Sequence, residues 1–348
     1  MKLAFLALSF ALATPVFAKA RPEHARVLLR GKAPIVALAY APDGQTLASA
    51  DEAHRVTLTD VSSGQTRQSF AYKSAVASLA FAPDGKLLAI GVGKQIRLLD
   101  PKSDMKTAVP VRVLEAENSV GGTINFSADG RVLLAVEGDY ENGGNYADIK
   151  PYVVNLWEVT SGKLIRRYGD RKTDTYAAAL SPDGKNFAAF TQGVNLSLFS
   201  IKTGEKLRDF SEDFPHNSGF YAHALAFSSN GKWLAGSGGF LESAGNLTVW
   251  EVATGKANWN RIFRDWGQSL AWAPDGSRVA AGTAYGTTYD DPDNLHRPTG
   301  APIWNANGRW QRSLQRVPGE INALAWAPNG KTLATGAKDS AVRLWKVG

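Results

Sequence analysis

The stretch LAWAPNGKTLATGAKDSAVRLWKV, residues 324–347, decides the fold of this chain. Apolar residues alternate with small or polar ones on both sides of Pro328-Asn329-Gly330, which is the period of β-strands. Proline presets the first corner of a turn and glycine accepts a positive φ, so this tripeptide predicts a tight turn. A third strand is predicted over AVRLWKV, residues 341–347. The stretch therefore predicts three antiparallel strands joined by short turns.

The first part of this stretch occurs seven times along the chain. Its copies are LAYAPDGQTL, LAFAPDGKLL, INFSADGRVL, AALSPDGKNF, LAFSSNGKWL, LAWAPDGSRV and LAWAPNGKTL, and their glycines are Gly44, Gly85, Gly130, Gly184, Gly231, Gly276 and Gly330. Successive glycines are 41, 45, 54, 47, 45 and 54 residues apart, which is the period of a four-stranded propeller blade. Later turns such as Thr160-Ser161-Gly162-Lys163 predict a fourth strand in each complete unit. We therefore expect an all-β fold, a seven-bladed β-propeller of four-stranded antiparallel blades.

The two ends of the repeat region complement each other. The last repeat stops after its third strand at Gly348, whereas ARVLLRG, residues 25–31, precedes the first repeat as an unpaired strand. An N-terminal strand that completes the last blade would remove two open sheet edges. We expect the ring to be closed in this way.

Residues 1–18 differ in composition from the repeats. A basic residue, Lys2, precedes an apolar run that is too short to cross a membrane, and Ala18 suits cleavage by a signal peptidase. We expect a cleaved secretory signal peptide over residues 1–18, a short linker over 19–24 and a single propeller over 25–348. The expected location is the periplasm, with secretion as the second choice.

Composition narrows the classes of partner. The chain has no cysteine, which excludes disulfides, a lipid-attached cysteine and thiolate metal sites. Its formal net charge is +7, which would suit nucleic acid in a cytoplasmic protein, but the expected export argues against that partner. No apolar stretch after the signal has transmembrane length, so we expect no membrane anchor, and a monomer is the default.

The third predicted strand carries a resemblance to a known family. GAKDSAVRLWKV, residues 336–347, resembles the WD-repeat signature, with Asp339 at its turn aspartate, Trp345 at its tryptophan and Lys346 in place of its usual aspartate. Matching third-strand pairs are Trp157-Glu158, Phe199-Ser200, Trp250-Glu251 and Trp304-Asn305, with weaker versions at Leu99-Asp100 and Thr59-Asp60. The resemblance covers residues 25–348 and implies a bacterial periplasmic WD-repeat-like propeller. No blade has the histidine of that family, so its buried His-Asp-Ser/Thr-Trp network is expected to be incomplete.

Antiparallel connections assign the loops to two faces. With strands named a to d from the channel outward, the a–b and c–d turns lie on one face, and the b–c loops and d–a links lie on the other. The turns are short, with lysines beside their glycines, which would suit anionic lipid or polymer unless those lysines are simply solvated. The other face receives four irregular segments from blades three to six, residues 137–151, 211–223, 238–246 and 284–300.

These four segments have the composition of a binding surface. They contain ten acidic residues against Lys150 and Arg297, with aromatic residues interleaved. Aromatic side chains among charges are typical of interfaces, and loops on rigid scaffolds often carry binding residues. We therefore predict a non-catalytic scaffold for a protein partner, with binding residues Tyr140, Tyr146, Phe214, Phe220, Tyr221, Tyr285, Tyr289, Glu137, Asp139 and Asp148.

A chemical alternative uses the same segments. Asp290, Asp291 and Asp293 are closely spaced hard oxygen ligands that suit calcium, although the full EF-hand pattern is absent, and no other cofactor is expected. The alternative function is a small-ligand binder or a metal-dependent, lactonase-like hydrolase at the channel mouth, although lactonase propellers have six blades. His216 and His223 form only a weak candidate metal pair, and no nucleophile motif is present, so the sequence leaves enzymatic activity open but favours a non-catalytic protein.

Overall fold

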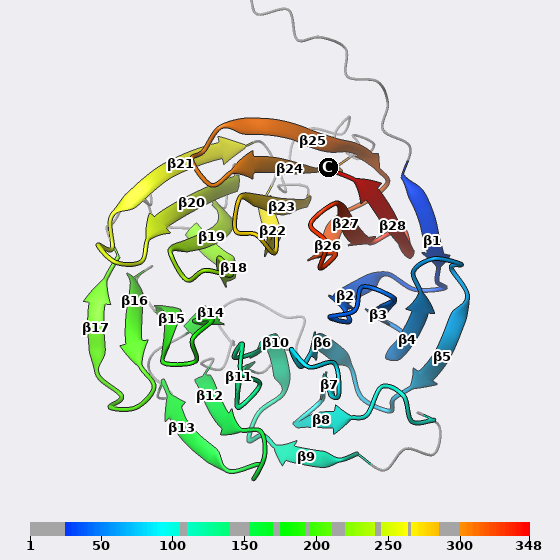
Figure 1. Ribbon diagram of the computed structural model, residues 1–348, viewed down its shortest axis with the longest axis horizontal. Coiled ribbons are helices and arrows are strands. Elements are labelled where there is room, and N and C mark those ends of the chain that lie inside the picture. The colour runs from blue at the N-terminus through cyan, green and yellow to red at the C-terminus, as the bar shows by residue number, and fades with distance from the viewer. Residues whose placement is uncertain are drawn as a thin grey trace, which may run out of the picture.

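The protein is a ring of β-sheets around a central channel (Figure 1). The computed structural model describes residues 25–104, 110–138, 153–169, 175–191, 195–210, 220–240, 245–263, 266–284 and 299–348. These residues form seven four-stranded antiparallel sheets, which confirms the predicted seven-bladed propeller. Within the described ranges no helix has the length and apolar character needed to span a membrane.

The strands follow one another around the ring in chain order. Blade 1 consists of β2 (Ile35–Tyr40), β3 (Thr46–Asp51), β4 (Arg55–Asp60) and β5 (Thr66–Ala71). Blade 2 consists of β6 (Val76–Phe81), β7 (Leu88–Val92), β8 (Gln95–Leu99) and β9 (Arg112–Glu115). Blade 3 consists of β10 (Val120–Phe126), β11 (Val132–Glu137), β12 (Val153–Glu158) and β13 (Leu164–Tyr168). Blade 4 consists of β14 (Thr175–Leu180), β15 (Asn186–Thr191), β16 (Asn195–Ser200) and β17 (Lys206–Asp209). Blade 5 consists of β18 (Phe220–Phe227), β19 (Trp233–Phe240), β20 (Gly245–Glu251) and β21 (Ala257–Phe263). Blade 6 consists of β22 (Trp266–Trp272), β23 (Arg278–Ala284), β24 (Thr299–Asn305) and β25 (Trp310–Val317). Blade 7 consists of β26 (Ile321–Trp326), β27 (Thr332–Ala337), β28 (Ala341–Lys346) and β1 (Arg26–Arg30).

The N-terminal strand closes the ring as expected. β1 pairs antiparallel with β28, with Arg26 opposite Leu344 and Arg30 opposite Ala341, and the two strands lie side by side in Figure 1. The Gly31 amide continues the ladder by donating to the Ser340 carbonyl at 2.7 Å. Blade 7 is therefore built from both ends of the chain.

The core lies between blades. Buried apolar residues form seven clusters, and each cluster joins the facing sheets of two neighbouring blades, including the closing pair of blades 7 and 1. Leu58 and Leu88, for example, belong to one cluster although they come from blades 1 and 2. A single blade cannot bury its own faces, so the ring is stable only as a whole.

The a–b turns follow from the repeated Pro-Asp/Asn-Gly sequence. In blade 7 the Gly330 amide donates to the Ala327 carbonyl at 2.9 Å, and the Asn329 side chain accepts from the Lys331 amide at 2.8 Å. Gly330 has a φ of 66°, a conformation that disfavours other residues. The turns also contact one another, because a Cβ placed on Gly85 would lie 3.6 Å from Cδ of Pro42 in the preceding blade. The same Pro-to-Gly contact recurs for Pro83–Gly130, Pro182–Gly231, Pro274–Gly330 and Pro328–Gly44.

A second set of contacts joins the outer strands. In six blades one side chain of the d strand donates to backbone carbonyls in the c–d turn or segment of the next blade; we call these the clasp residues, and they are Arg26, Gln68, Arg112, Arg166, Arg208 and Trp259. Four of them lie four residues after a turn glycine, a spacing that sequence analysis missed. Between blades 6 and 7 Arg278 of β23 bonds to the carbonyls of Gly330 and Val347 instead.

Several clasps need the turn glycine of the next blade. A Cβ on Gly204 would lie 2.7 Å from a guanidinium nitrogen of Arg166, and a Cβ on Gly162 would lie 2.5 Å from Cδ of Arg112. Both glycines also have a positive φ. The glycine therefore serves its own turn and gives room to the preceding blade.

The WD-type network is incomplete, in agreement with the sequence. In blade 7 the Trp345 indole donates to the Thr335 hydroxyl at 3.0 Å, whereas Asp339 forms an ion pair with the buried Arg343. In blade 3 Ala135 occupies the position of Thr335, and the buried indole N–H of Trp157 has no hydrogen-bond partner among the described residues. At this position blade 3 therefore relies on packing, whereas blade 7 also has a hydrogen bond.

Deletion of residues 25–30 should destabilise the whole ring. It removes the buried Leu28, worth about 1.5–3 kcal/mol, and leaves β28 as an open edge. We expect a lower urea midpoint and association in size-exclusion chromatography, whereas deletion of residues 19–24 should change neither. An unchanged midpoint after the first deletion would contradict ring closure by β1.

The clasp can be measured with a double-mutant cycle. Gly204→Ala should cost more than the about 1–2 kcal/mol of a positive φ alone, because its Cβ meets Arg166. In an Arg166→Ala background this excess should disappear. The matched control is Gly231→Ala, which has a similar φ but whose Cβ would lie no closer than 3.8 Å to its neighbour. Urea unfolding measures the four values, and an equal Gly204→Ala cost in both backgrounds would refute the coupling.

Candidate functional site

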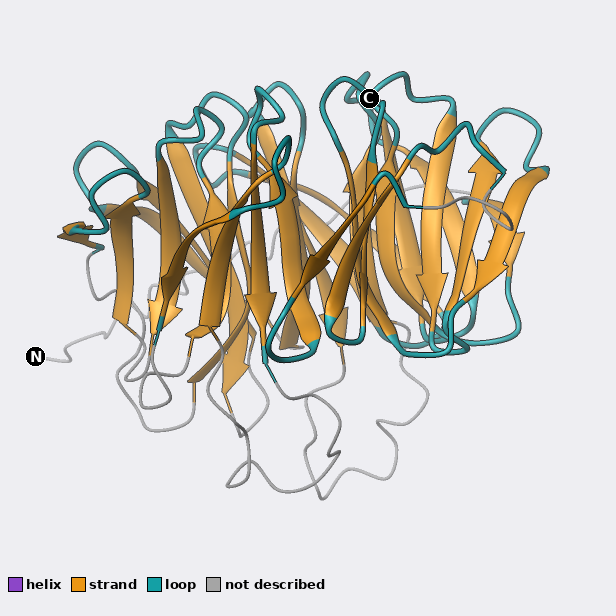
Figure 2. Ribbon diagram, turned by 90° about the horizontal axis from the view of Figure 1, so that it is seen from below, coloured by secondary structure: helices purple, strands orange, loops and turns teal. Residues whose placement is uncertain are grey.

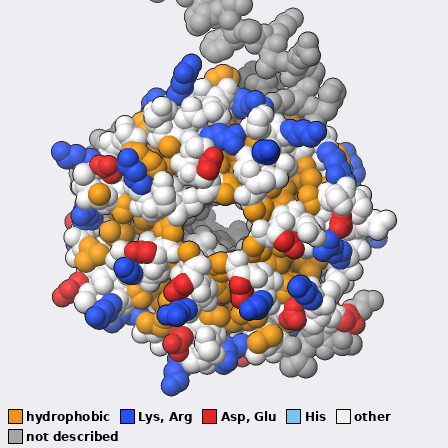
Figure 3. Space-filling model, in the orientation of Figure 1, with side chains coloured by type: hydrophobic (Ala, Val, Ile, Leu, Met, Phe, Trp, Pro, Cys, Tyr) orange, Lys and Arg blue, Asp and Glu red, His pale blue; other side chains and the backbone are white. Residues whose placement is uncertain are grey.

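The strand order gives the ring two different faces. The a–b and c–d turns form one face, which we call the turn face, and the b–c loops and d–a links form the insertion face. Figure 2 shows the ring edge-on with the turn face uppermost, and Figure 3 looks onto the turn face. The irregular segments found in the sequence all start and end on strands at the insertion face.

The turn face is mixed in charge rather than uniformly basic. Lys86 lies 3.6 Å from Asp84 and Arg131 lies 3.9 Å from Asp129, because each follows the aspartate of its own turn. Figure 3 shows acidic side chains among the basic ones over the lower half of this face, while basic side chains predominate along its upper arc. A partner on this face would therefore meet charges of both signs.

Most predicted rim residues lie outside the described residues. These are Tyr140, Tyr146, Phe214, Tyr285, Tyr289, Asp139 and Asp148, together with the candidate calcium ligands Asp290, Asp291 and Asp293. What the structure places is the strand ends from which their segments leave. Val120 pairs with Glu137, Phe220 with Phe240 and Trp266 with Ala284, so these ends of blades 3, 5 and 6 face the same side.

The predicted loop borders in blade 5 are wrong. Residues 220–223 and 238–240 were expected in connections, but they extend β18 and β19, with Phe220 opposite Phe240 and Tyr221 opposite Gly239. Glycines at 238 and 239 hid the strand period in the sequence, while backbone pairing with an aromatic strand supplies the extension. Phe220 and Tyr221 therefore belong to the rigid blade.

Glu137 is inside the blade rather than on the rim surface. Its side chain is 0% exposed and accepts from the Asn155 side chain and from the backbone amides of Glu117 and Asn118, the latter two at 3.2 and 3.4 Å. Burial raises the pKa of Glu137, against the lowering effects of these hydrogen bonds and of Arg167. Its carboxylate thus ties the d–a link, β11 and β12 together at the base of the 139–152 segment.

The central channel is uncharged along its described wall. It has a volume of about 600 Å³ and is lined by the inner strands of all seven blades, with Asn125, Gln268 and Asn322 among its polar groups. His223 lies in a bulge of β18, and burial lowers its pKa to about 4, so it is neutral at physiological pH. In the parts of the chain that the structure describes, no group of three or more His, Asp or Glu residues could hold a metal.

Glu137 should give stability a pH dependence of defined sign. Because its folded pKa is raised, the folded state keeps a proton that the unfolded chain loses, so stability should fall as pH rises from about 4 through the folded pKa. The isosteric Glu137→Gln should remove this fall, since a rotated Asn155 amide can still pair with it. Urea unfolding between about pH 4 and about pH 7 gives the free energy of unfolding of both proteins. The contributions of the other titrating groups cancel in the difference between them. Parallel curves would contradict a buried, titrating Glu137.

Comparison with known proteins agrees with the blade geometry. The family profile "WD domain, G-beta repeat" matches residues 311–346, which run from β25 into β28. WD repeat-containing protein SL1-17 of Schistosoma mansoni is 26% identical over 126 residues, which are 36% of this chain and 39% of that protein. The match thus spans well under two thirds of that relative. Together with the seven-bladed ring and the Trp345–Thr335 pair, these findings support a WD-repeat β-propeller.

Proposed function

We propose that this propeller is a non-catalytic scaffold that binds a protein partner through the insertion face of blades 3–6. WD-repeat propellers generally mediate protein interactions, which supports the broad class. The observation that carries the finer proposal is the asymmetry of the ring. Its turn face is built from short turns in contact with one another, whereas the four irregular segments of its sequence leave from strand ends on the opposite face.

The composition of those segments supports a protein partner. Apart from the buried Glu137, they contain nine acidic residues against two basic ones, and aromatic residues are interleaved. Aromatic side chains supply contact area at low entropy cost, and acidic neighbours select a basic partner surface. Glu137 takes no direct part, because its carboxylate is used to hold the base of one segment.

We also propose that the protein acts after export to the periplasm. The support is the apolar run with a basic start over residues 1–18, which lies outside the described residues. Cell fractionation with N-terminal sequencing tests this point separately from partner binding. Recovery of an uncleaved chain from the cytoplasm would reject it.

The partner-binding test is crosslinking in cells that produce the tagged protein. The variant replaces residues 139–151 and 286–297 by Asn-Gly, which keeps Glu137 and the strand ends of β12, β23 and β24. The matched control carries Lys163→Ala, Lys206→Ala and Lys256→Ala on the turn face. We expect one protein to be captured by the wild type and the control and lost by the variant, with unfolding midpoints unchanged. Equal capture by all three would reject the insertion-face proposal.

Point substitutions separate the scaffold from the alternative function. For a scaffold, alanine at Tyr140, Tyr146, Phe220 or Tyr289 should each lower partner affinity, by about 1–2 kcal/mol at a contact that matters. A calcium-dependent hydrolase or ligand binder should respond instead to a chelator and to Asp291→Asn. If the chelator and Asp291→Asn abolish ligand binding or activity while the alanine variants have no effect, the alternative function is favoured.

A further inference from the structure

A crevice between blades recurs on the turn face. One copy, between blades 1 and 2, has a volume of about 390 Å³, and a second, between blades 4 and 5, has about 430 Å³. The two are lined by equivalent positions of the repeat, with Ala41, Pro42, Asp43, Thr46, Leu58, Phe81, Gly85 and Pro101 in the first corresponding to Ser181, Pro182, Asp183, Asn186, Leu198, Phe227, Gly231 and Val252 in the second. The repeat itself therefore produces the shape of the cavity, and the second copy is an internal control for the first.

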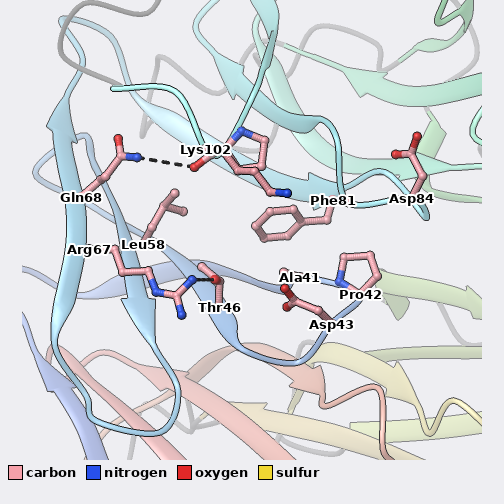
Figure 4. Close-up of a pocket in the computed structure, with 12 residues that line it drawn as sticks. Ala41, Pro42, Asp43, Thr46, Leu58, Arg67, Gln68, Phe81, Asp84 and Lys102 are labelled. Carbon is pink, nitrogen blue, oxygen red and sulfur yellow. Dashed lines mark hydrogen bonds between the residues drawn. The ribbon is translucent and has the colours of Figure 1, made fainter.

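The crevice between blades 1 and 2 has an apolar floor. Leu58, Phe81 and Pro42 line it (Figure 4), and Pro101 is a further lining residue. The floor is rigid, because Leu58 is 1% exposed and both residues pack in the cluster that joins the two blades. Such a surface suits an apolar or aromatic group.

The two crevices differ in charge. The first has two carboxylates, Asp43 and Asp84, and two cations, Arg67 and Lys102. The second keeps only Asp183 from this set. Asn230 replaces Asp84, Leu207 replaces Arg67 and Ala253 replaces Lys102 at the equivalent positions.

The local fold holds these charges in place. Arg67 donates to the Thr46 hydroxyl at 2.7 Å and to Asp60 at 2.5 Å, and hydrogen bonds from Ser62, Ser63 and Arg67 lower the pKa of Asp60 so that it stays ionised. Asp43 and Asp84 each use one oxygen to accept the backbone amide two residues on, at 2.8 and 2.9 Å.

The clasp residue beside the crevice between blades 1 and 2 differs from those of the next three blades. Here the clasp residue is Gln68, which donates to the Ser103 carbonyl at 2.9 Å and holds the segment that carries Pro101 and Lys102. Blades 2, 3 and 4 use arginine at this position. Residues 100–111 also lack the turn glycine that other blades have there.

We propose that the crevice between blades 1 and 2 binds a small zwitterion with an apolar body, either a free α-amino acid or a short peptide. Its ammonium group would face Asp43 and Asp84, its carboxylate would face Arg67 and Lys102, and its side chain would lie on Phe81, above the buried Leu58. Arg67 keeps its ion pair with Asp60, and Asp84 lies 3.6 Å from Lys86, so charges of both signs surround the crevice and a ligand with one charge meets like charge. The site lies on the face opposite to the proposed partner surface and does not depend on it.

The test is calorimetric titration of the mature full chain with four probes. These are the dipeptide glycyl-phenylalanine, its N-acetyl form, its C-terminal amide and free phenylalanine. We expect the dipeptide to bind with a Kd of about 1 mM or tighter and each blocked form at least about tenfold more weakly. Free phenylalanine separates the two sources, because binding equal to that of the dipeptide assigns an amino-acid site and weaker binding assigns a peptide site.

Point variants replace charged residues of the crevice between blades 1 and 2 by the residues found at the equivalent positions between blades 4 and 5. Asp84→Asn and Lys102→Ala change exposed side chains and should each weaken dipeptide binding about tenfold with no change in unfolding midpoint. Asn230→Asp in the other crevice is the matched control and should leave binding unchanged. Arg67→Leu completes the conversion and is read only if the protein still unfolds cooperatively. No heat with any probe, or equal binding by wild type and Asp84→Asn, would overturn the proposal.

Discussion

Contact between neighbouring blades is the interaction on which everything else in this protein depends. Each of the seven apolar clusters joins two sheets, so no blade has a core of its own. Two further sets of contacts reinforce these interfaces, the packing between successive a–b turns and the hydrogen bonds of the clasp residues on the outer strands. Displacing one blade would therefore expose apolar residues on both of its sides.

The fold was predictable because one sequence signal is repeated. Seven Asp/Asn-Gly turns at the period of a blade predict seven blades, and the unpaired strand in residues 25–31 predicts ring closure. Both predictions are confirmed. The departure from WD-repeat hydrogen bonding was expected from the missing histidine, whereas the loss of the Trp157 partner at Ala135 became clear from the strand register. Sequence was sufficient where one short stretch, such as the Pro-Asp-Gly turn, determines both its own conformation and its contact with the turn of the next blade.

The candidate site was less accessible to sequence reasoning. An acidic residue next to a long insertion, Glu137, looks like a surface group, because sequence gives no sign of the amides of Glu117 and Asn118 that surround it. The strand extension at Phe220 was hidden by glycines on its partner strand. Four of the six clasp residues did have a signal, the spacing of four residues after a turn glycine, but its meaning depends on the next blade. The crevice between blades 1 and 2 is likewise lined by residues of two blades, so no single stretch of sequence indicates it.

Ring closure by β1 has a consequence for how the chain must assemble. Arg26 pairs with Leu344, so the first strand has no partner until almost the entire chain is available, and contacts of such sequence separation form slowly. During this interval RVLLR is an apolar strand without a sheet, the kind of segment that aggregates. Its two ends are Arg26 and Arg30, both exposed in the finished ring. Positive charges at the ends of an apolar strand act as gatekeepers against self-association, and Arg26 and Arg30 place such charges at both ends of this strand.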